Sequence, residues 1–84
     1  MDNATEFNRL RWRCTHRAQR EMDVLLGNFL ERRYADLAPA HAAAFAALVE
    51  LEDIELWPLI IGKRAASDPA QAEVLAMLKD ARLV

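Results

Sequence analysis

Apolar residues recur every three or four positions along most of the chain, and this spacing limits the chain to a helical fold. The clearest case is the segment 18–34, whose apolar positions are Met22, Leu25, Leu26, Phe29 and Leu30. Side chains three and four apart lie on one face of a helix, so these five form a stripe that other elements must cover. No segment shows the every-second-residue alternation of a half-buried strand. The sequence therefore predicts an all-α fold.

The pattern divides into five helical segments joined by short loops. We expect them at residues 3–14, 18–34, 40–51 and 52–61, with a last helix that opens in the segment SDPAQAE. Pro39 and Pro69 are placed for first helical turns. Pro58 should shorten or kink the fourth helix, and Gly62 should end it. The expected architecture is a small compact bundle of four to five short helices.

Each segment has an apolar face that should point inward. Besides the stripe of residues 18–34, the expected core positions are Phe7, Leu10, Cys14, Phe45, Leu48, one or both of Val49 and Leu51, Val74, Leu75, Met77 and Leu78. Gly27 falls inside the second segment, where glycine costs roughly 1 kcal/mol relative to alanine. We expect it to mark a bend or a close approach by a neighbouring backbone.

Length and composition favour one small domain spanning residues 1–84. The hydrophobic fraction is 54%, which suits a packed core, and no apolar run approaches the ~20 residues that span a bilayer. The first residues, MDNATEF, are acidic and polar, unlike a signal sequence. Cys14 is the single cysteine, which suits a reducing compartment. We therefore expect a small cytoplasmic protein without membrane insertion.

The residues that could support catalysis are few and scattered. Cys14 and His16 are two apart, so they should point in different directions, and His41 is distant in sequence. One cysteine and two separated histidines do not have metal-ligand spacing. Two glycines cannot form a glycine-rich phosphate loop. We expect a non-enzyme with no catalytic residues and no metal site, and with Cys14 in the core.

Charge is distributed unevenly, although the net charge is only −2. Residues 9–20 contain five arginines and no acid, whereas residues 35–62 contain five acids and no lysine or arginine. The asymmetry indicates either a partner-binding surface or two segments that face each other in the fold. A basic helix for nucleic acid is an alternative, but the overall acidity favours a protein partner.

A resemblance to a known family is carried by the segment RLRWRCTHRAQREMDVLLGNFLE. It resembles the N-terminal half of the SdhE family, the small succinate dehydrogenase assembly factors. The family signature is R-G-x-x-E, preceded by an Arg-Leu pair and an aromatic residue and followed by a leucine-rich run. The corresponding positions here are Arg9, Leu10, Trp12, Arg17, Ala18 and Glu21. A later segment, FAALVELEDIELW, resembles the family's second block, so the resemblance spans residues 9–62.

The chain departs from the family pattern at two positions. Ala18 replaces the signature glycine, which gives R-A-x-x-E. A tryptophan common late in the second block is Leu59 here, with Trp57 two residues earlier. Glycine would let a partner's backbone come close, and alanine adds one methyl group. We expect reshaped or weakened docking rather than its loss.

The resemblance implies a chaperone that binds the flavoprotein subunit of succinate dehydrogenase, and often that of fumarate reductase. It implies that the factor promotes covalent attachment of FAD to a histidine of that subunit and holds no stably bound cofactor itself. The implied partner-binding residues are Arg17, Ala18, Glu21, Arg9, Trp12 and Arg20. Arg17 and Glu21 lie four apart, so we expect them to share one helical turn and face the partner together.

Two points stay open at this level. The alternative explanation of Arg17 and Glu21 is that they form only a surface salt bridge. Trp12 is either an exposed anchor for a partner or half buried in the bundle. An antitoxin-like regulatory module is the alternative function, with a basic-helix nucleic-acid binder behind it. We expect the free protein to be a monomer.

Overall fold

The computed structural model describes residues 3–17 and 19–83, and these form five α-helices and one 3₁₀ turn without any strand. The elements are α1 (Asn3–Thr15), α2 (Arg20–Arg33), η1 (Tyr34–Asp36), α3 (Pro39–Val49), α4 (Asp53–Ile60) and α5 (Pro69–Leu83). The all-α prediction is confirmed. Two predicted boundaries are wrong by two residues, since the second helix begins at Arg20 rather than residue 18 and the third ends at Val49 rather than residue 51; the other boundaries agree to within one residue.

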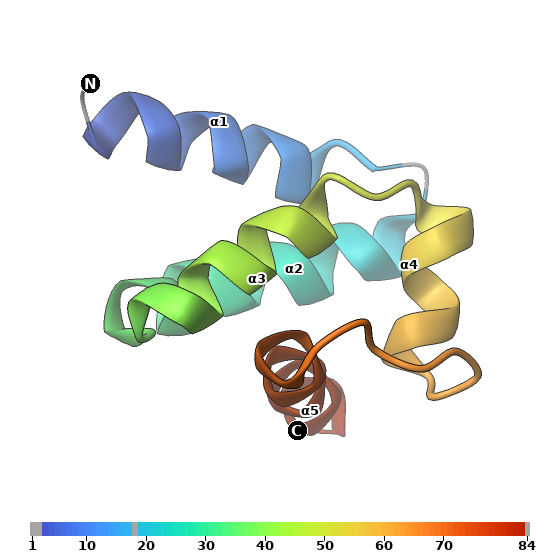
Figure 1. Cartoon of the computed structure of the whole chain (residues 1–84). Coiled ribbons are helices and arrows are strands. Elements are labelled where there is room, and N and C mark those ends of the chain that lie inside the picture. The colour runs from blue at the N-terminus through green and yellow to red at the C-terminus, as the bar shows by residue number, and fades with distance from the viewer. Residues whose placement is uncertain (1–2, 18, 84) are drawn as a thin grey trace.

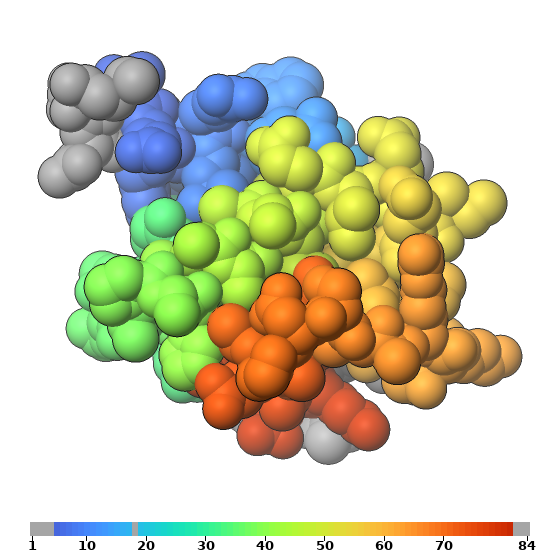
Figure 2. Space-filling view, viewed as in Figure 1, coloured from blue at the N-terminus to red at the C-terminus, as the bar shows by residue number. Residues whose placement is uncertain are grey.

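The helices pack as a small bundle in which α1 and α5 lie on opposite sides of α3. In Figure 1, α1 (blue) runs along one side, α3 (green) crosses the middle, and α5 (red-brown) is seen end-on at the other side. Helix α1 packs chiefly on α2, and α3 packs chiefly on α5. The space-filling view shows α3 exposed along this face between α1 and the orange segment that leads into α5 (Figure 2).

The ends of the last two helices follow local sequence signals. Gly62 has a positive φ of 83°, and the N–H of Lys63 donates to the carbonyl of Pro58 at 2.8 Å, which is the hydrogen bond of a Schellman motif. The predicted stop at Gly62 is confirmed. At the start of α5, Oδ1 of Asp68 accepts from the N–H of Gln71 at 2.8 Å. Asp68 therefore caps the helix, and Pro69 follows at its first position.

One apolar core joins all five helices. The whole predicted stripe of α2 is buried in it, and its fully buried members also include Cys14, Phe45, Leu48, Val49, Leu56, Ile60, Val74 and Leu78. Phe29 of α2 and Phe45 of α3 lie 4.9 Å apart between ring centroids, and Tyr34 lies 5.9 Å from Phe45. Phe7, Leu51 and Met77 are only partly buried at the edge of this core. Ile54 of α4 points away from the core and is 84% exposed.

The close neighbour of Gly27 is a side chain and not the backbone that was expected. A Cβ atom built at this position would lie 3.3 Å from Cγ2 of Thr15, at the end of α1. That distance is shorter than an ordinary van der Waals contact, so glycine lets α1 pack close to α2 here. The hydroxyl of Thr15 donates to the carbonyl of Arg11 at 2.9 Å, which helps to fix the methyl group against α2.

We expect Gly27→Ala to stabilise the protein fully only when the methyl group of Thr15 is removed. Alanine gains about 1 kcal/mol in a helix interior, but its Cβ meets the Thr15 methyl group. In a Thr15→Ser background the replacement should raise Tm by about 4–8 °C, and it should raise Tm less in the wild type. Thermal melts of the wild type, Gly27→Ala, Thr15→Ser and the double variant measure the Tm change in each background. An equal Tm change in both backgrounds would contradict the close contact.

Candidate functional site

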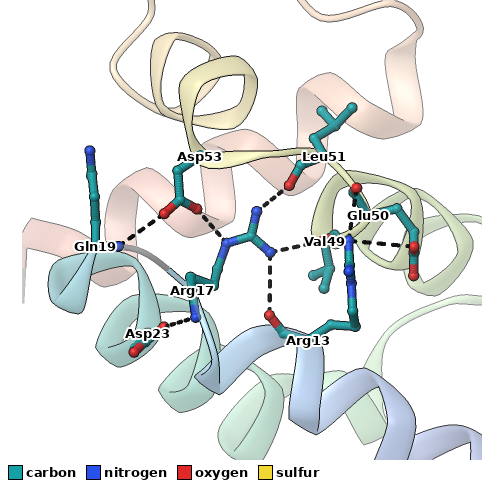
Figure 3. A network of polar contacts seen from close by, with 8 residues as sticks. All are labelled: Arg13, Arg17, Gln19, Asp23, Val49, Glu50, Leu51 and Asp53. Atoms are coloured by element: carbon teal, nitrogen blue, oxygen red, sulfur yellow. Dashed lines mark hydrogen bonds and ion pairs between the residues drawn. The ribbon is translucent and has the colours of Figure 1, made fainter.

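The side chain of Arg17 lies inside the protein, at the point where four helix ends meet. Arg17 belongs to the linker of residues 16–19 between α1 and α2, and its side chain is only 5% exposed. Its Nε donates to Oδ1 of Asp53 at 2.6 Å. Its Nη1 donates to the carbonyls of Val49 at 2.8 Å and Arg13 at 3.3 Å, and its Nη2 donates to the carbonyl of Leu51 (Figure 3).

The position of Arg17 suits the electrostatics of the surrounding helices. Arg13 is in the last turn of α1, Val49 is the last residue of α3, and Leu51 follows shortly after. Carbonyls at helix C-termini lack intrahelical donors and carry the negative end of the helix dipole. The planar guanidinium supplies donors to these carbonyls and to a carboxylate at the same time. One side chain therefore joins the ends of α1 and α3 to the start of α4.

Two aspartates fix the linker backbone beside the guanidinium. Oδ2 of Asp53, at the first position of α4, accepts from the N–H of Gln19 at 3.0 Å. Oδ1 of Asp23, in the first turn of α2, accepts from the N–H of Arg17 at 2.7 Å. The carboxylate of Asp53 is also little exposed, at 11%. The linker is thereby attached to α2 and to α4 (Figure 3).

The expected geometry of the signature residues is wrong in one respect. Arg17 precedes α2, so Arg17 and Glu21 do not share a helical turn, and the Arg17 side chain faces inward. Its ion-pair partner is Asp53, thirty-six residues along the chain. Glu21 lies in the first turn of α2 and is exposed, as expected. Ala18 lies outside the described residues.

Other candidate residues lie on the surface near this junction. Trp12 is 57% exposed, which settles the open question of its burial, and its ring stacks on His16 at 4.3 Å and 7°. Nδ1 of His16 is 2.9 Å from the carbonyl of Trp12. Arg9 and Arg20 are exposed and form no ion pair with any residue that the structure describes.

A groove of about 670 Å³ lies between the end of α1 and α4, beside the Trp12–His16 stack. Its apolar walls include Trp57 and the exposed Ile54, and its base reaches the Arg17–Asp53 pair. The sequence did not mark Ile54 or Asp53 as site residues. Asp53 stood out only as one of several acids, and no spacing rule links it to the linker arginine.

One explanation of the charge asymmetry, that the basic and acidic segments face each other, is confirmed, and a partner-binding surface stays a prediction. Arg11, Arg13 and Arg17 form ion pairs with Glu31, Glu50 and Asp53 at N–O distances of 3.0, 3.6 and 2.6 Å. Two of these carboxylates belong to the acidic segment, so the two segments do face each other. The remaining arginines of the basic segment are available to a partner.

The structure also places Cys14, which the sequence offered as a possible catalytic residue. Cys14 is fully buried, as predicted, and burial raises the pKa of its thiol to about 12, although the charge of Arg17 opposes this shift. The thiol is therefore protonated at neutral pH, and it is a poor nucleophile. Among the described residues there is no group of His, Cys, Asp and Glu that could hold a metal ion, and no helix long and apolar enough to cross a membrane.

Comparison with known proteins gives consistent matches over most of the chain. A family model described as flavinator of succinate dehydrogenase matches residues 8–82. The FAD assembly factor SdhE of Xylella fastidiosa is 32% identical over 79 residues, which cover 94% of this chain and 80% of the relative. The protein of that name from Shewanella oneidensis is 34% identical over 84% of this chain and 85% of its own length. The Methylococcus capsulatus protein is 32% identical over 89% of both chains.

We expect Arg17→Ala to destabilise the protein severely. It would leave Asp53 buried without its cation and three carbonyls without a donor, and breaking such a pair costs about 3–5 kcal/mol. Urea unfolding measures the loss. Arg20→Ala, an exposed arginine three residues away, is the matched control and should change the unfolding free energy by less than about 0.5 kcal/mol. Similar small losses in both variants would show that the Arg17 pair is not structural.

A second expectation concerns alkaline pH. The folded thiol of Cys14 has a pKa of about 12 against an ordinary value of 9.0. The unfolded chain therefore loses this proton first, and stability should fall as pH rises through the interval between the two values. Tm should drop more steeply from pH 8 to 11 in the wild type than in Cys14→Ala. Parallel curves would exclude this contribution.

Proposed function

The chain belongs to the family of flavinators of succinate dehydrogenase, and we propose that it is an FAD assembly factor for the flavoprotein subunit of that enzyme. The observation that carries the proposal is the family match over residues 8–82, which includes parts of every helix of the bundle. In this proposal the factor binds the flavoprotein and promotes covalent attachment of FAD. We extend the proposal to the flavoprotein of fumarate reductase as a second partner, in the bacterial cytoplasm.

The proposed role is that of a chaperone and not of an enzyme. The flavin and its attachment site belong to the partner, and this chain holds no flavin of its own. Binding would hold the flavoprotein so that flavin and acceptor side chain meet in a reactive geometry, which is a proximity effect. A protonated, buried Cys14 is consistent with this role, since it offers no nucleophile to the reaction.

We place the partner-binding surface around the linker between α1 and α2. Trp12 and Arg9 lie on the α1 side of this surface, and Arg20 and Glu21 lie on the α2 side. Arg17 contributes indirectly, as a buried positioning residue. It fixes the linker backbone between the α1 side and the α2 side of this surface. Exposed tryptophan and arginine are the residue types that most often dominate protein interfaces.

The pairing of the arginines favours a protein partner over nucleic acid. Three of the five arginines of residues 9–20 are engaged with carboxylates of this chain. A nucleic-acid site depends on several free cations near one another, since phosphate contacts supply most of the affinity. We also propose that the free factor is a monomer, which leaves this surface open to the flavoprotein.

We expect Glu21→Ala to abolish flavoprotein binding without changing Tm appreciably. Glu21 is exposed, so it contributes little to folding. At an interface its loss would leave partner donors buried without an acceptor, at a cost of about 2–5 kcal/mol. Titration against purified flavoprotein and in-gel flavin fluorescence of the product measure the effect. Trp12→Ala should show the same pattern.

The matched control is Glu6→Ala, which removes an exposed carboxylate from the far end of α1. It should bind and flavinylate as the wild type does. Ala18→Gly restores the signature glycine and should strengthen binding. Unchanged flavin fluorescence in cells that lack the factor would reject the assembly role itself, whereas normal binding by Glu21→Ala would reject only the assigned surface.

A further inference from the structure

A second groove, of about 740 Å³, runs along α2 and is closed on one side by Ala81 of α5. Its α2 residues form two rows with a spacing of four. They are Arg20, Val24, Asn28 and Arg32 in one row and Glu21, Leu25, Phe29 and Arg33 in the other. The groove therefore follows the whole of α2, which is 14 residues long, or about 21 Å.

The floor of the groove is apolar and its outer edge is basic. Leu25 and Phe29 are buried beneath it, while Val24 is 52% exposed between the arginines. The guanidinium of Arg33 lies over the Phe29 ring at 5.9 Å. Three arginines against one glutamate give the groove a positive charge, although the whole chain has a net charge of −2.

Arg20 is the residue that the fold itself does not explain. Arg32 and Arg33 lie in the last turn of α2, where the helix dipole favours cations. Arg20 is the first residue of α2, where the dipole disfavours a cation, and it forms no ion pair with a described residue. Arg20 therefore adds a positive charge, without a carboxylate partner among the described residues, at the end of the groove near the exposed Val24.

We propose that this groove binds an acidic peptide segment of a protein, extended along α2, with an apolar side chain seated on Val24. Arg20 and Arg32 are twelve residues apart, about 18 Å along the helix. Carboxylates five or six residues apart in an extended segment span about the same distance. One end would pair with Arg20 and the other with Arg32 and Arg33, where carboxylate–guanidinium pairing is strongest.

The same features argue against a phosphate backbone as the occupant. A phosphate backbone has no apolar group to seat on the exposed Val24 at the centre of the groove, whereas a peptide can supply an apolar side chain there. The groove shares Arg20 and Glu21 with the partner-binding surface proposed above, so the inference extends that surface along α2, but it depends on the groove and not on which protein supplies the segment.

The test uses the full chain and the end-blocked peptide EESLSEE as the probe, with binding followed by amide chemical shifts. We expect saturable shifts centred on Val24 and Asn28, and a Kd that rises with salt because the contacts are ionic. The peptides EESSSEE, without the apolar residue, and KKSLSKK, with reversed charge, should bind at least about tenfold more weakly. Equal binding of either control peptide would overturn the proposal.

Matched charge reversals locate the site. Arg32→Glu with Arg33→Glu should weaken EESLSEE by about tenfold or more, whereas Lys63→Glu with Arg64→Glu, an equal charge change in the loop after α4, should alter it less than about twofold. Val24→Glu is the second variant; Val24 is exposed, so the fold and Tm should be retained while binding is lost. Equal losses from both double variants would overturn the proposal.

The same spectra decide between occupants. A single-stranded oligonucleotide should leave Val24 and Asn28 unshifted, and shifts there larger than those from the peptide would overturn the proposal. Sedimentation should show that the free chain does not self-associate through this face; a dimer that Val24→Glu dissolves would assign the groove to a second copy instead.

Discussion

The buried pair of Arg17 and Asp53 is the interaction on which the rest of this structure depends. A buried charge is tolerated only when its partners nearly replace the water it has lost. Arg17 meets this condition with one carboxylate and three carbonyls. Those partners come from the ends of α1, α3 and α4, while the Arg17 backbone is bound to Asp23 of α2. The relative positions of four helices are thus tied to one guanidinium.

The Arg17–Asp53 pair also affects how the surface residues on either side of the linker are arranged. Trp12 is one turn before the linker, and Glu21 is in the turn after it, so the geometry of the linker sets their separation. In a bundle of 84 residues the apolar core alone specifies helix packing less precisely than a set of directed hydrogen bonds does. In the proposed function the buried arginine would preorganise the partner-binding surface, which lowers the cost of ordering that surface at the moment of association.

The sequence predicted the elements well and the site less well, for a physical reason. Helical periodicity reports which face of each segment is buried, and the α2 stripe is buried as expected. Local signals also placed Gly62 and Pro69 correctly, because caps depend on neighbouring residues. The pairing of Arg17 with Asp53 depends on tertiary contact across thirty-six residues, and no local rule records it. Because Arg17 stands in a run of arginines, its sequence position suggests a surface residue. Only the tertiary structure shows that its side chain is buried.

Arg17 and Glu21, the two charged residues of the R-A-x-x-E segment, therefore lie in different environments, although they are only four residues apart. One guanidinium is inside, where its loss acts on folding and reaches the surface only through the linker. One carboxylate is outside, on the surface that we propose for the partner. A spacing of four usually implies a shared helical face, but here the helix begins between the two residues. The segment therefore spans a buried structural anchor and an exposed group, and its spacing is the length of chain that passes from the interior of the bundle to its surface.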